Sequence, residues 1–205
     1  MKTITTFIGV IGSGKDYRAE SMIRERGCVR LDFKDALIEM CSDLLGFDIR
    51  PRYDLFKNHL IGLPLQEPNP MLQQIAWQES KTMQERYPGL MTGRRLLQRL
   101  GTDVMRKRDP EYWVNAWKDS ACELLDQGKD VVCADCRFEN EILRIIRMTG
   151  YTSNFIFCDY RSNRYDACST HASEKMAQKF LECGYKDGQT LTPQDLTLVL
   201  GEVVA

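Results

Sequence analysis

The most informative segment of the chain reads Gly9-Val10-Ile11-Gly12-Ser13-Gly14-Lys15-Asp16. Its glycine and lysine spacing is typical of a P-loop, the phosphate-binding turn between a strand and a helix. The β-branched and aromatic run at residues 3–8 predicts a buried strand before it. Residues 17–26 predict a helix after it, which Gly27 ends. Such a turn aims backbone N–H groups and a helix N-terminus at one phosphate.

The residues of this segment have distinct predicted tasks in holding a nucleotide. Gly12 and Gly14 allow a close approach of the backbone, and Lys15 supplies a mobile positive charge for the β- and γ-phosphates. Asp16 stands where the pattern has Ser or Thr, and a carboxylate can also hold Mg²⁺. The predicted nucleotide-binding residues are Gly9, Gly12, Ser13, Gly14, Lys15, Asp16 and Tyr17.

Composition limits the class of protein. The chain has 205 residues, of which 43% are hydrophobic, and this is enough to bury the core of one domain. A formal net charge of -1 argues against a dedicated nucleic-acid binder. No apolar run approaches a membrane span and no signal pattern opens the chain, which favours a cytoplasmic protein. The eight cysteines are expected to be reduced thiols.

Strands and helices alternate at both ends of the sequence. This alternation predicts an α/β fold of the P-loop NTPase kind, with three α/β/α layers and a parallel sheet. The core is expected at residues 1–40 and 119–205, and residues 41–118 are expected to form a helical substrate-binding insertion without a convincing strand. The last helix should begin at Thr192-Pro193. The five predicted strands are residues 3–8, 27–31, 130–135, 155–158 and 183–186.

Charged residues gather at two places that suit an anionic substrate. Asp135 ends an apolar strand in the manner of a Walker B strand, at the sheet edge where α/β proteins bind ligands. With Asp16 it is the predicted metal site. A basic cluster also stands out against the near-neutral net charge, and the arginine fork suits phosphate. That cluster is Arg94, Arg95, Arg99, Arg106, Lys107 and Arg108.

Several blocks of the sequence resemble the bacteriophage-type deoxynucleoside monophosphate kinases, and the resemblance covers most of the chain. The blocks are residues 13–16, Phe33-Lys34-Asp35-Ala36-Leu37, residues 95–102, Asp135-Cys136-Arg137-Phe138-Glu139-Asn140-Glu141 and His171-Ala172-Ser173-Glu174. Two positions depart from the family pattern, because Tyr17 replaces a usual Thr and only Asp187-Gly188 remains of an Asn-Asp-Gly turn. The aspartate that ends the P-loop also recurs in the related phosphomevalonate kinases.

The resemblance implies transfer of the ATP γ-phosphoryl group to a deoxynucleoside 5′-monophosphate, with ATP and Mg²⁺ as cofactors. The acceptor phosphate is already ionised, so positioning and charge neutralisation suffice and no general base is required. The expected catalytic residues are Lys15, Arg137, Arg161 and Arg164. The expected substrate-binding residues are Asp35, Arg94, Arg95, Gln98, Thr102, Arg106, Arg137 and Glu141. Gln98 is the candidate for the base edge, because its amide both donates and accepts.

Three other functions stay open at this point. A kinase with a hydroxyl acceptor, such as a nucleoside or a hydroxymethylated pyrimidine in a nucleotide or in DNA, would need a base, and Asp32 or Asp35 could be that base. A phosphomevalonate-type kinase is the second, although Gln98 and the long insertion favour a nucleobase. A nucleotide-binding regulator without turnover is the third. The expected partner is a small deoxynucleotide, with no stable nucleic-acid or membrane contact, in the host cytoplasm if the gene is a phage's. A homodimer is also open.

Overall fold

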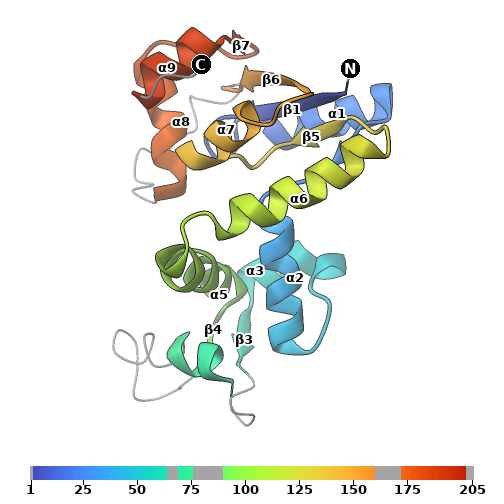
Figure 1. Ribbon diagram of the computed structural model, residues 1–205. Coiled ribbons are helices and arrows are strands. Elements are labelled where there is room, and N and C mark those ends of the chain that lie inside the picture. Colours follow the sequence, from blue (N-terminus) through green and yellow to red (C-terminus); the bar gives the residue numbers. More distant parts are fainter. Residues whose placement is uncertain (1, 64–68, 76–89, 160–171, 202–205) are drawn as a thin grey trace. The chain divides into compact units, whose positions relative to one another are not determined.

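The computed structural model describes residues 2–63, 69–75, 90–159 and 172–201 (Figure 1). The chain divides into two compact units, each with its own core. Unit 1 combines Met1–Phe33 with Val114–Ala205, and unit 2 is Lys34–Trp113. Unit 2 therefore contains most of the segment, residues 41–118, in which the sequence predicts an insertion.

Unit 1 is built on a five-stranded sheet, and its predicted α/β class is confirmed. The first four strands in the sheet order are parallel, and the central strand pairs with a parallel neighbour on each side. The strands in that order are β2 (Val29–Arg30), β5 (Val131–Cys133), β1 (Thr3–Ile8), β6 (Thr152–Phe157) and β7 (Thr190–Leu191).

The prediction of the fifth strand is wrong in both position and direction. β7 runs antiparallel to β6 and pairs Leu191 with Phe155, so the sheet is mixed rather than fully parallel. The predicted strand at residues 183–186 is instead a turn, because the N–H of Tyr185 closes back on the Phe180 carbonyl and Gly184 has a φ of 83°. A residue with that φ cannot continue a strand, and only glycine adopts it without strain.

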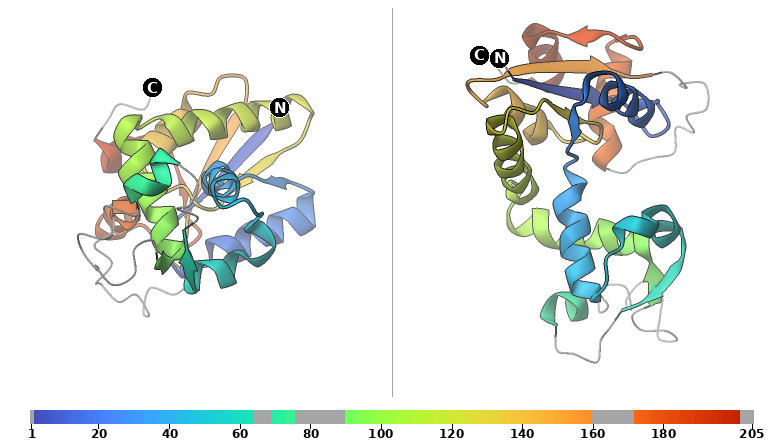
Figure 2. Two further views of the ribbon diagram at one scale, coloured as in Figure 1. Left: turned by 90° about the horizontal axis from the view of Figure 1, so that it is seen from below. Right: turned by 90° about the vertical axis from the view of Figure 1, so that its right-hand side faces the viewer.

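Alternation along β1 sends its side chains into two separate cores on opposite faces of the sheet. Ile4 and Ile8 are fully buried in the larger core, to which α6 (Tyr112–Asp126), α7 (Glu139–Ile146), α8 (Ala172–Glu182) and α9 (Pro193–Leu200) contribute. Phe7 faces the smaller core with Ala19 of α1 (Lys15–Arg26). The left view of Figure 2 shows α1 and α6 on opposite sides of these strands. The strand that precedes the glycine segment is thus held from both faces.

Local capping signals fix the last helix of unit 1 as predicted. The Thr192 hydroxyl accepts a hydrogen bond from the N–H of Asp195 at 3.2 Å, and the Asp195 carboxylate accepts one from the N–H of Thr192 at 2.8 Å. Pro193 occupies the first helical position. This reciprocal arrangement satisfies two backbone donors that the helix itself leaves open.

Unit 2 is mostly helical, with buried Ile38, Leu96 and Leu100 in its core. It also contains a pair of antiparallel strands, which corrects the prediction that this region has none. Each strand is three residues long, too short to leave a hydrophobic period in the sequence. The elements are α2 (Lys34–Leu45), η1 (Arg50–Arg52), α3 (Tyr53–Asn58), β3 (Leu60–Gly62), β4 (Leu90–Thr92), α5 (Gly93–Gln98) and the π-helix η2 (Arg99–Arg106).

The described residues contain neither a helix suited to span a membrane nor a disulfide bond. None of the helices that the structure describes is both long and apolar enough to cross a membrane. The seven described cysteines are all free thiols, as expected from the sequence.

Candidate active site

The glycine segment forms a tight loop between β1 and α1. Gly14 is the residue that caps α1, and its φ of 86° lies in the left-handed region that favours glycine. Gly9 is needed for a different reason. A Cβ atom there would lie 2.3 Å from the Cys158 carbonyl oxygen and 2.6 Å from the Ser13 hydroxyl. The loop therefore packs directly against the chain at the end of β6.

Lys15 is the first residue of α1 and folds back into the loop. Its side chain is buried, at 6% exposure. The ammonium group donates to the Val10 carbonyl at 2.6 Å and to the Ser13 hydroxyl at 3.3 Å. The loop thus encloses a positive charge, at a helix N-terminus whose own dipole also favours an anion.

A second group of polar side chains lies at the carboxyl ends of β2 and β5. Ligand atoms of Asp32, Cys133 and Asp135 lie within 4.8 Å of one another, and all three residues are buried. Asp32 accepts a hydrogen bond from the N–H of Ala134 at 2.9 Å. Asp135 accepts one from the N–H of Phe33 at 2.7 Å. Both carboxylates are thereby fixed to the backbone of the neighbouring strand.

Among these three ligand atoms, the oxygens are the ones suited to a metal ion. Burial, together with the nearby charges of Asp135 and Asp32, raises the pKa of the Cys133 thiol well above its ordinary value. The thiol therefore stays protonated, and only a thiolate is a good metal ligand. The carboxylate oxygens of Asp32 and Asp135 are the donors that a hard cation such as Mg²⁺ prefers.

Asp16, the other predicted metal ligand, lies outside this acidic cluster and pairs with a cationic side chain. Its carboxylate forms an ion pair with the guanidinium of Arg30 on β2. Arg30 also binds Asp32, through Nη2 at 2.7 Å and Nε at 2.8 Å. Arg30 thus connects the first turn of α1 with the acidic cluster. Within the first turn of α1, Lys15 is buried whereas Asp16 and Tyr17 are exposed.

Arg137 follows the acidic cluster in a loop that Glu141 fixes. The Glu141 carboxylate accepts hydrogen bonds from the N–H of Arg137 at 2.6 Å and from the N–H of Phe138 at 3.1 Å. Glu141 is almost fully buried, at 1% exposure. Its contacts therefore hold the backbone at the start of α7. Glu139, the neighbouring carboxylate, forms an ion pair with Lys179.

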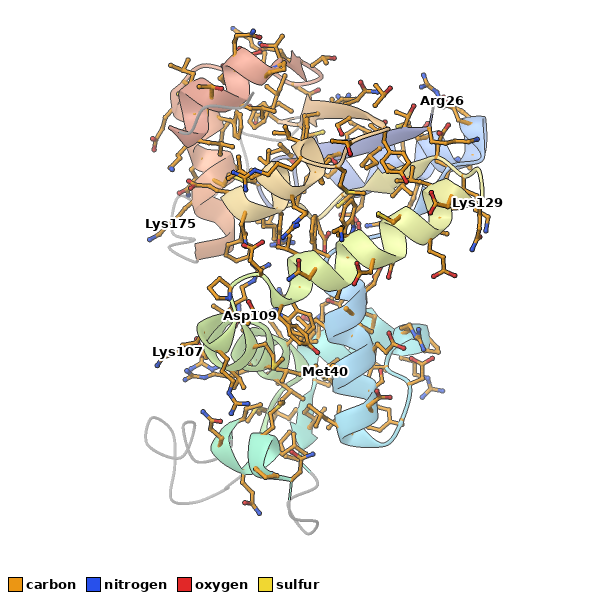
Figure 3. All side chains as sticks on the ribbon, in the orientation of Figure 1. Arg26, Met40, Lys107, Asp109, Lys129 and Lys175 are labelled. Carbon is orange, nitrogen blue, oxygen red and sulfur yellow. The ribbon has the colours of Figure 1, made fainter. Side chains whose placement is uncertain are left out.

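All of the predicted substrate-binding residues of unit 2 except Asp35 lie on one continuous helical run, α5 and η2. Thr92 caps the run by accepting a hydrogen bond from the N–H of Arg95 at 3.2 Å. Lys107, labelled in Figure 3, follows its end and is exposed. Arg94 and Arg95 are exposed, whereas the other predicted residues are partly buried. Those others are Gln98, Thr102 and Arg106.

The remaining predicted site residues are Asp35, Arg161 and Arg164. Asp35 is exposed in the first turn of α2 in unit 2. Arg161 and Arg164, the predicted catalytic arginines, lie outside the described residues.

A cavity of about 890 Å³ lies beside α1 in unit 1. Gly14 and Tyr17 line one part of it, and it extends along the helix to Arg26, which Figure 3 labels. Neither Lys15 nor the acidic cluster contributes to its lining. The buried charges described above, and not this cavity, define the candidate site.

Sequence reasoning missed Arg30, although a local signal for it exists. Arg30 ends β2 and Asp32 follows two positions later, so two opposite charges close together in the sequence were the available signal. No comparable signal links Arg30 to Asp16, because these two residues come from different elements.

Comparison with known proteins adds evidence that is independent of this geometry. A family model described as deoxynucleotide monophosphate kinase matches residues 56–179, which is more than half of the chain. The matched range contains the α5 and η2 run, Asp135, Arg137 and Glu141, and it begins after the glycine loop. A search of curated proteins finds no match.

Proposed function

The chain belongs to the deoxynucleotide monophosphate kinase family, and we propose that it transfers the γ-phosphoryl group of ATP to a deoxynucleoside 5′-monophosphate. The product is the diphosphate. The observation that carries the donor half of this proposal is the burial of Lys15 inside a glycine loop at the N-terminus of α1. Among the functions left open by the sequence, the family match favours the phosphate acceptor over the hydroxyl acceptor, the phosphomevalonate-type substrate and the regulator.

The donor phosphates are assigned to the glycine loop. Its backbone N–H groups and the start of α1 supply fixed partial positive charge, and Lys15 supplies a full one. The Lys15 ammonium group donates to two oxygens of the loop itself, Val10 O and Ser13 Oγ. A phosphate oxygen would exchange with these neutral acceptors and would offer a stronger, charge-assisted hydrogen bond.

The metal ion is assigned to the acidic cluster. The oxygen donors of Asp135 and Asp32 fit Mg²⁺ and lie together, whereas Asp16 is not part of this cluster. When bound, Mg²⁺ would offset the negative charge of the phosphates during transfer. Backbone hydrogen bonds hold the carboxylates of Asp135 and Asp32 at this end of the strands.

The acceptor phosphate is assigned to arginine side chains. Arg137 is the first candidate, and Glu141 acts on it by fixing the backbone of its loop. Arg94, Arg95 and Arg106 are the candidates on the α5 and η2 run, where Gln98 is assigned to the base edge and Thr102 to the same substrate. Asp35 is a further candidate for the substrate. Arg161 and Arg164 remain candidates for the transferring group.

A direct assay tests the proposal. Purified protein would be incubated with ATP, Mg²⁺ and each member of a panel of natural and 5-modified deoxynucleoside monophosphates, beside the matching nucleosides. We expect diphosphate formation from at least one monophosphate and none from its nucleoside. Equal use of a nucleoside, or ATP binding without transfer to any acceptor, contradicts the proposal.

A further inference from the structure

The carboxylate at position 16 creates an electrostatic problem for the donor site described above. Most P-loops carry a neutral hydroxyl at this position. Here Asp16 lies in the first turn of α1, directly after Lys15, and its side chain is 69% exposed. A fixed negative charge beside a bound triphosphate opposes binding, because both compete for the same helix N-terminus.

Arg30 lies where its positive charge can offset the negative charge of the Asp16 carboxylate. Its guanidinium contacts Asp16 on one side and buried Asp32 on the other, and its own side chain is 27% exposed. A guanidinium is effectively always protonated in proteins, so Arg30 carries a positive charge that contacts both carboxylates.

We propose that Arg30 is a positioning and charge-compensating residue for the donor site, which holds the Asp16 carboxylate and cancels its repulsion of the triphosphate. The proposal rests on the proposed function, because it assumes that the glycine loop binds ATP. It explains how a carboxylate is accommodated in place of the hydroxyl. Because the two charges cancel, removing Arg30 alone should weaken ATP binding more than removing Arg30 and Asp16 together.

A purely structural role for Arg30 makes a different prediction. Asp32 is 2% exposed and would lose a cationic partner if Arg30 were removed, which lowers stability whatever residue stands at position 16. Charge compensation instead makes the cost of removing Arg30 depend on Asp16. A double-mutant cycle separates these two roles, since it measures the coupling between positions 16 and 30.

The experiment compares wild type, Arg30→Ala, Arg30→Lys, Asp16→Ser and the Asp16→Ser/Arg30→Ala double variant. The control is Arg24→Ala, which removes an exposed arginine from α1. The readouts are the ATP dissociation constant by calorimetry without Mg²⁺, the KM for ATP and kcat with Mg²⁺, and the unfolding temperature. Measuring ATP binding without metal isolates the repulsion between Asp16 and the phosphates.

Arg30→Ala should weaken ATP binding about tenfold, roughly the effect of one uncompensated charge near a protein surface. The KM for ATP should rise in parallel, with kcat changed less. Arg30→Lys should stay within about threefold of wild type, because the charge is retained even though the fork is lost. The double variant should recover most of the lost affinity while its unfolding temperature stays low.

Two results would overturn the inference. One is an ATP affinity of Arg30→Ala equal to that of Arg24→Ala. The other is a double variant that binds ATP as weakly as Arg30→Ala, which would leave Arg30 with a structural role only. Failure of the donor-site assignment itself is recognised separately, since Lys15→Ala would then bind ATP as well as wild type.

Discussion

Asp32 and Asp135 each bind the backbone of the other's strand. Asp32 at the end of β2 accepts from the N–H of Ala134 at 2.9 Å, and Asp135 at the end of β5 accepts from the N–H of Phe33 at 2.7 Å. The main-chain ladder between these strands also reaches this edge, since the N–H of Leu31 donates to the Val132 carbonyl at 2.9 Å. Two buried carboxylates are therefore fixed side by side by the fold itself.

The first prediction concerns the metal. Asp135→Asn keeps an oxygen that can accept from the N–H of Phe33 but loses the charge, so the fold should persist. We expect the Mg²⁺ concentration for half-maximal turnover to rise about tenfold, as expected for the loss of one charged oxygen ligand. The measurement is a Mg²⁺ titration of kcat at saturating nucleotide.

A matched control exists at the opposite end of the same strand. Asp130 precedes β5 and accepts from the N–H of Thr3 at 2.8 Å, so Asp130→Asn makes the same chemical change at the other sheet edge. Its Mg²⁺ titration should match that of wild type. If the Mg²⁺ concentration for half-maximal turnover rises equally in Asp130→Asn and Asp135→Asn, Asp135 is not a ligand of the metal.

The second prediction concerns the donor phosphates. Lys15→Ala removes the buried positive charge that the glycine loop encloses, and turnover should fall about a hundredfold or more, as on loss of one preorganised electrostatic donor. Because Lys15 also donates to Val10 O and Ser13 Oγ, a modest fall in unfolding temperature is expected as well. Lys118→Ala, which breaks a 3.5 Å surface pair with Asp119, is the control. A Lys15→Ala enzyme with the kcat of the control would contradict the donor assignment.

Local signals explain which parts of the fold were predictable. Residues 3–8 and Thr192-Pro193 carry their own evidence, in β-branched composition and in capping chemistry, and both elements form as predicted. β7 has two residues and takes its partner from β6, so its position depends on the tertiary fold. A strand that short has no period for a sequence pattern to detect.

The candidate site divides in the same way. The glycine loop and Asp135 are adjacent to strands whose ends the sequence reveals, and the structure describes them there. The bond between Asp32 and Ala134 joins residues 102 positions apart, and no single-sequence pattern reports such a contact. Glu141 is predicted to bind the substrate, and the structure adds that its carboxylate accepts hydrogen bonds from the backbone of Arg137 and Phe138. The burial of Glu141 is set by packing and not by residue type, so the sequence does not reveal these contacts.

The third prediction concerns the close packing of the loop. Gly9→Ala would place a Cβ atom 2.3 Å from the Cys158 carbonyl oxygen, so the backbone must shift, at a cost of about 1–3 kcal/mol. Both the unfolding temperature and ATP affinity should fall. Gly62→Ala is the control, because no atom lies within 4 Å of the added Cβ. Unfolding temperatures that fall equally in the two variants would show that the contact with Cys158 is relaxed at no cost.

The fourth prediction concerns acid stability through the cap of α9. Hydrogen bonds from the backbone and hydroxyl of Thr192, and then from Tyr185, lower the pKa of Asp195 below its ordinary value. A lowered pKa in the folded state stabilises the protein above the unfolded value of about 3.9 and ceases to do so as the pH falls through the folded pKa. The unfolding temperature of wild type should exceed that of Asp195→Asn at pH 7, and the difference should shrink below about pH 4.

The control for this pH dependence is Asp119→Asn, whose only described partner is the long 3.5 Å pair with Lys118. Its unfolding temperature should follow that of wild type across the whole range. If the gap between wild type and Asp195→Asn is constant from pH 7 to pH 3, the ionised carboxylate is not what stabilises the cap.

The last prediction tests the acceptor, through Arg137. Glu139 and Glu141 follow Arg137 closely in the sequence, so a surface ion pair with one of them is the alternative to a hold on the acceptor phosphate. A surface ion pair would contribute about 1 kcal/mol or less. An arginine that holds the acceptor phosphate should cost about 3 kcal/mol or more in kcat/KM when it is removed, since orientation and charge are lost together.

The measurement is kcat/KM for one deoxynucleoside monophosphate with wild type, Arg137→Ala and Arg137→Lys. Arg137→Lys should recover little, because an ammonium group cannot reproduce the two parallel hydrogen bonds of the fork. Arg144→Ala on α7, the helix that follows Arg137, removes a 3.0 Å surface hydrogen bond to Asn115 and should behave as wild type. If Arg137 binds the 5′-phosphate, wild type should be inactive with the matching nucleoside, which lacks that phosphate. A fall in kcat/KM of less than about tenfold in both Arg137 variants would assign the acceptor phosphate to other residues.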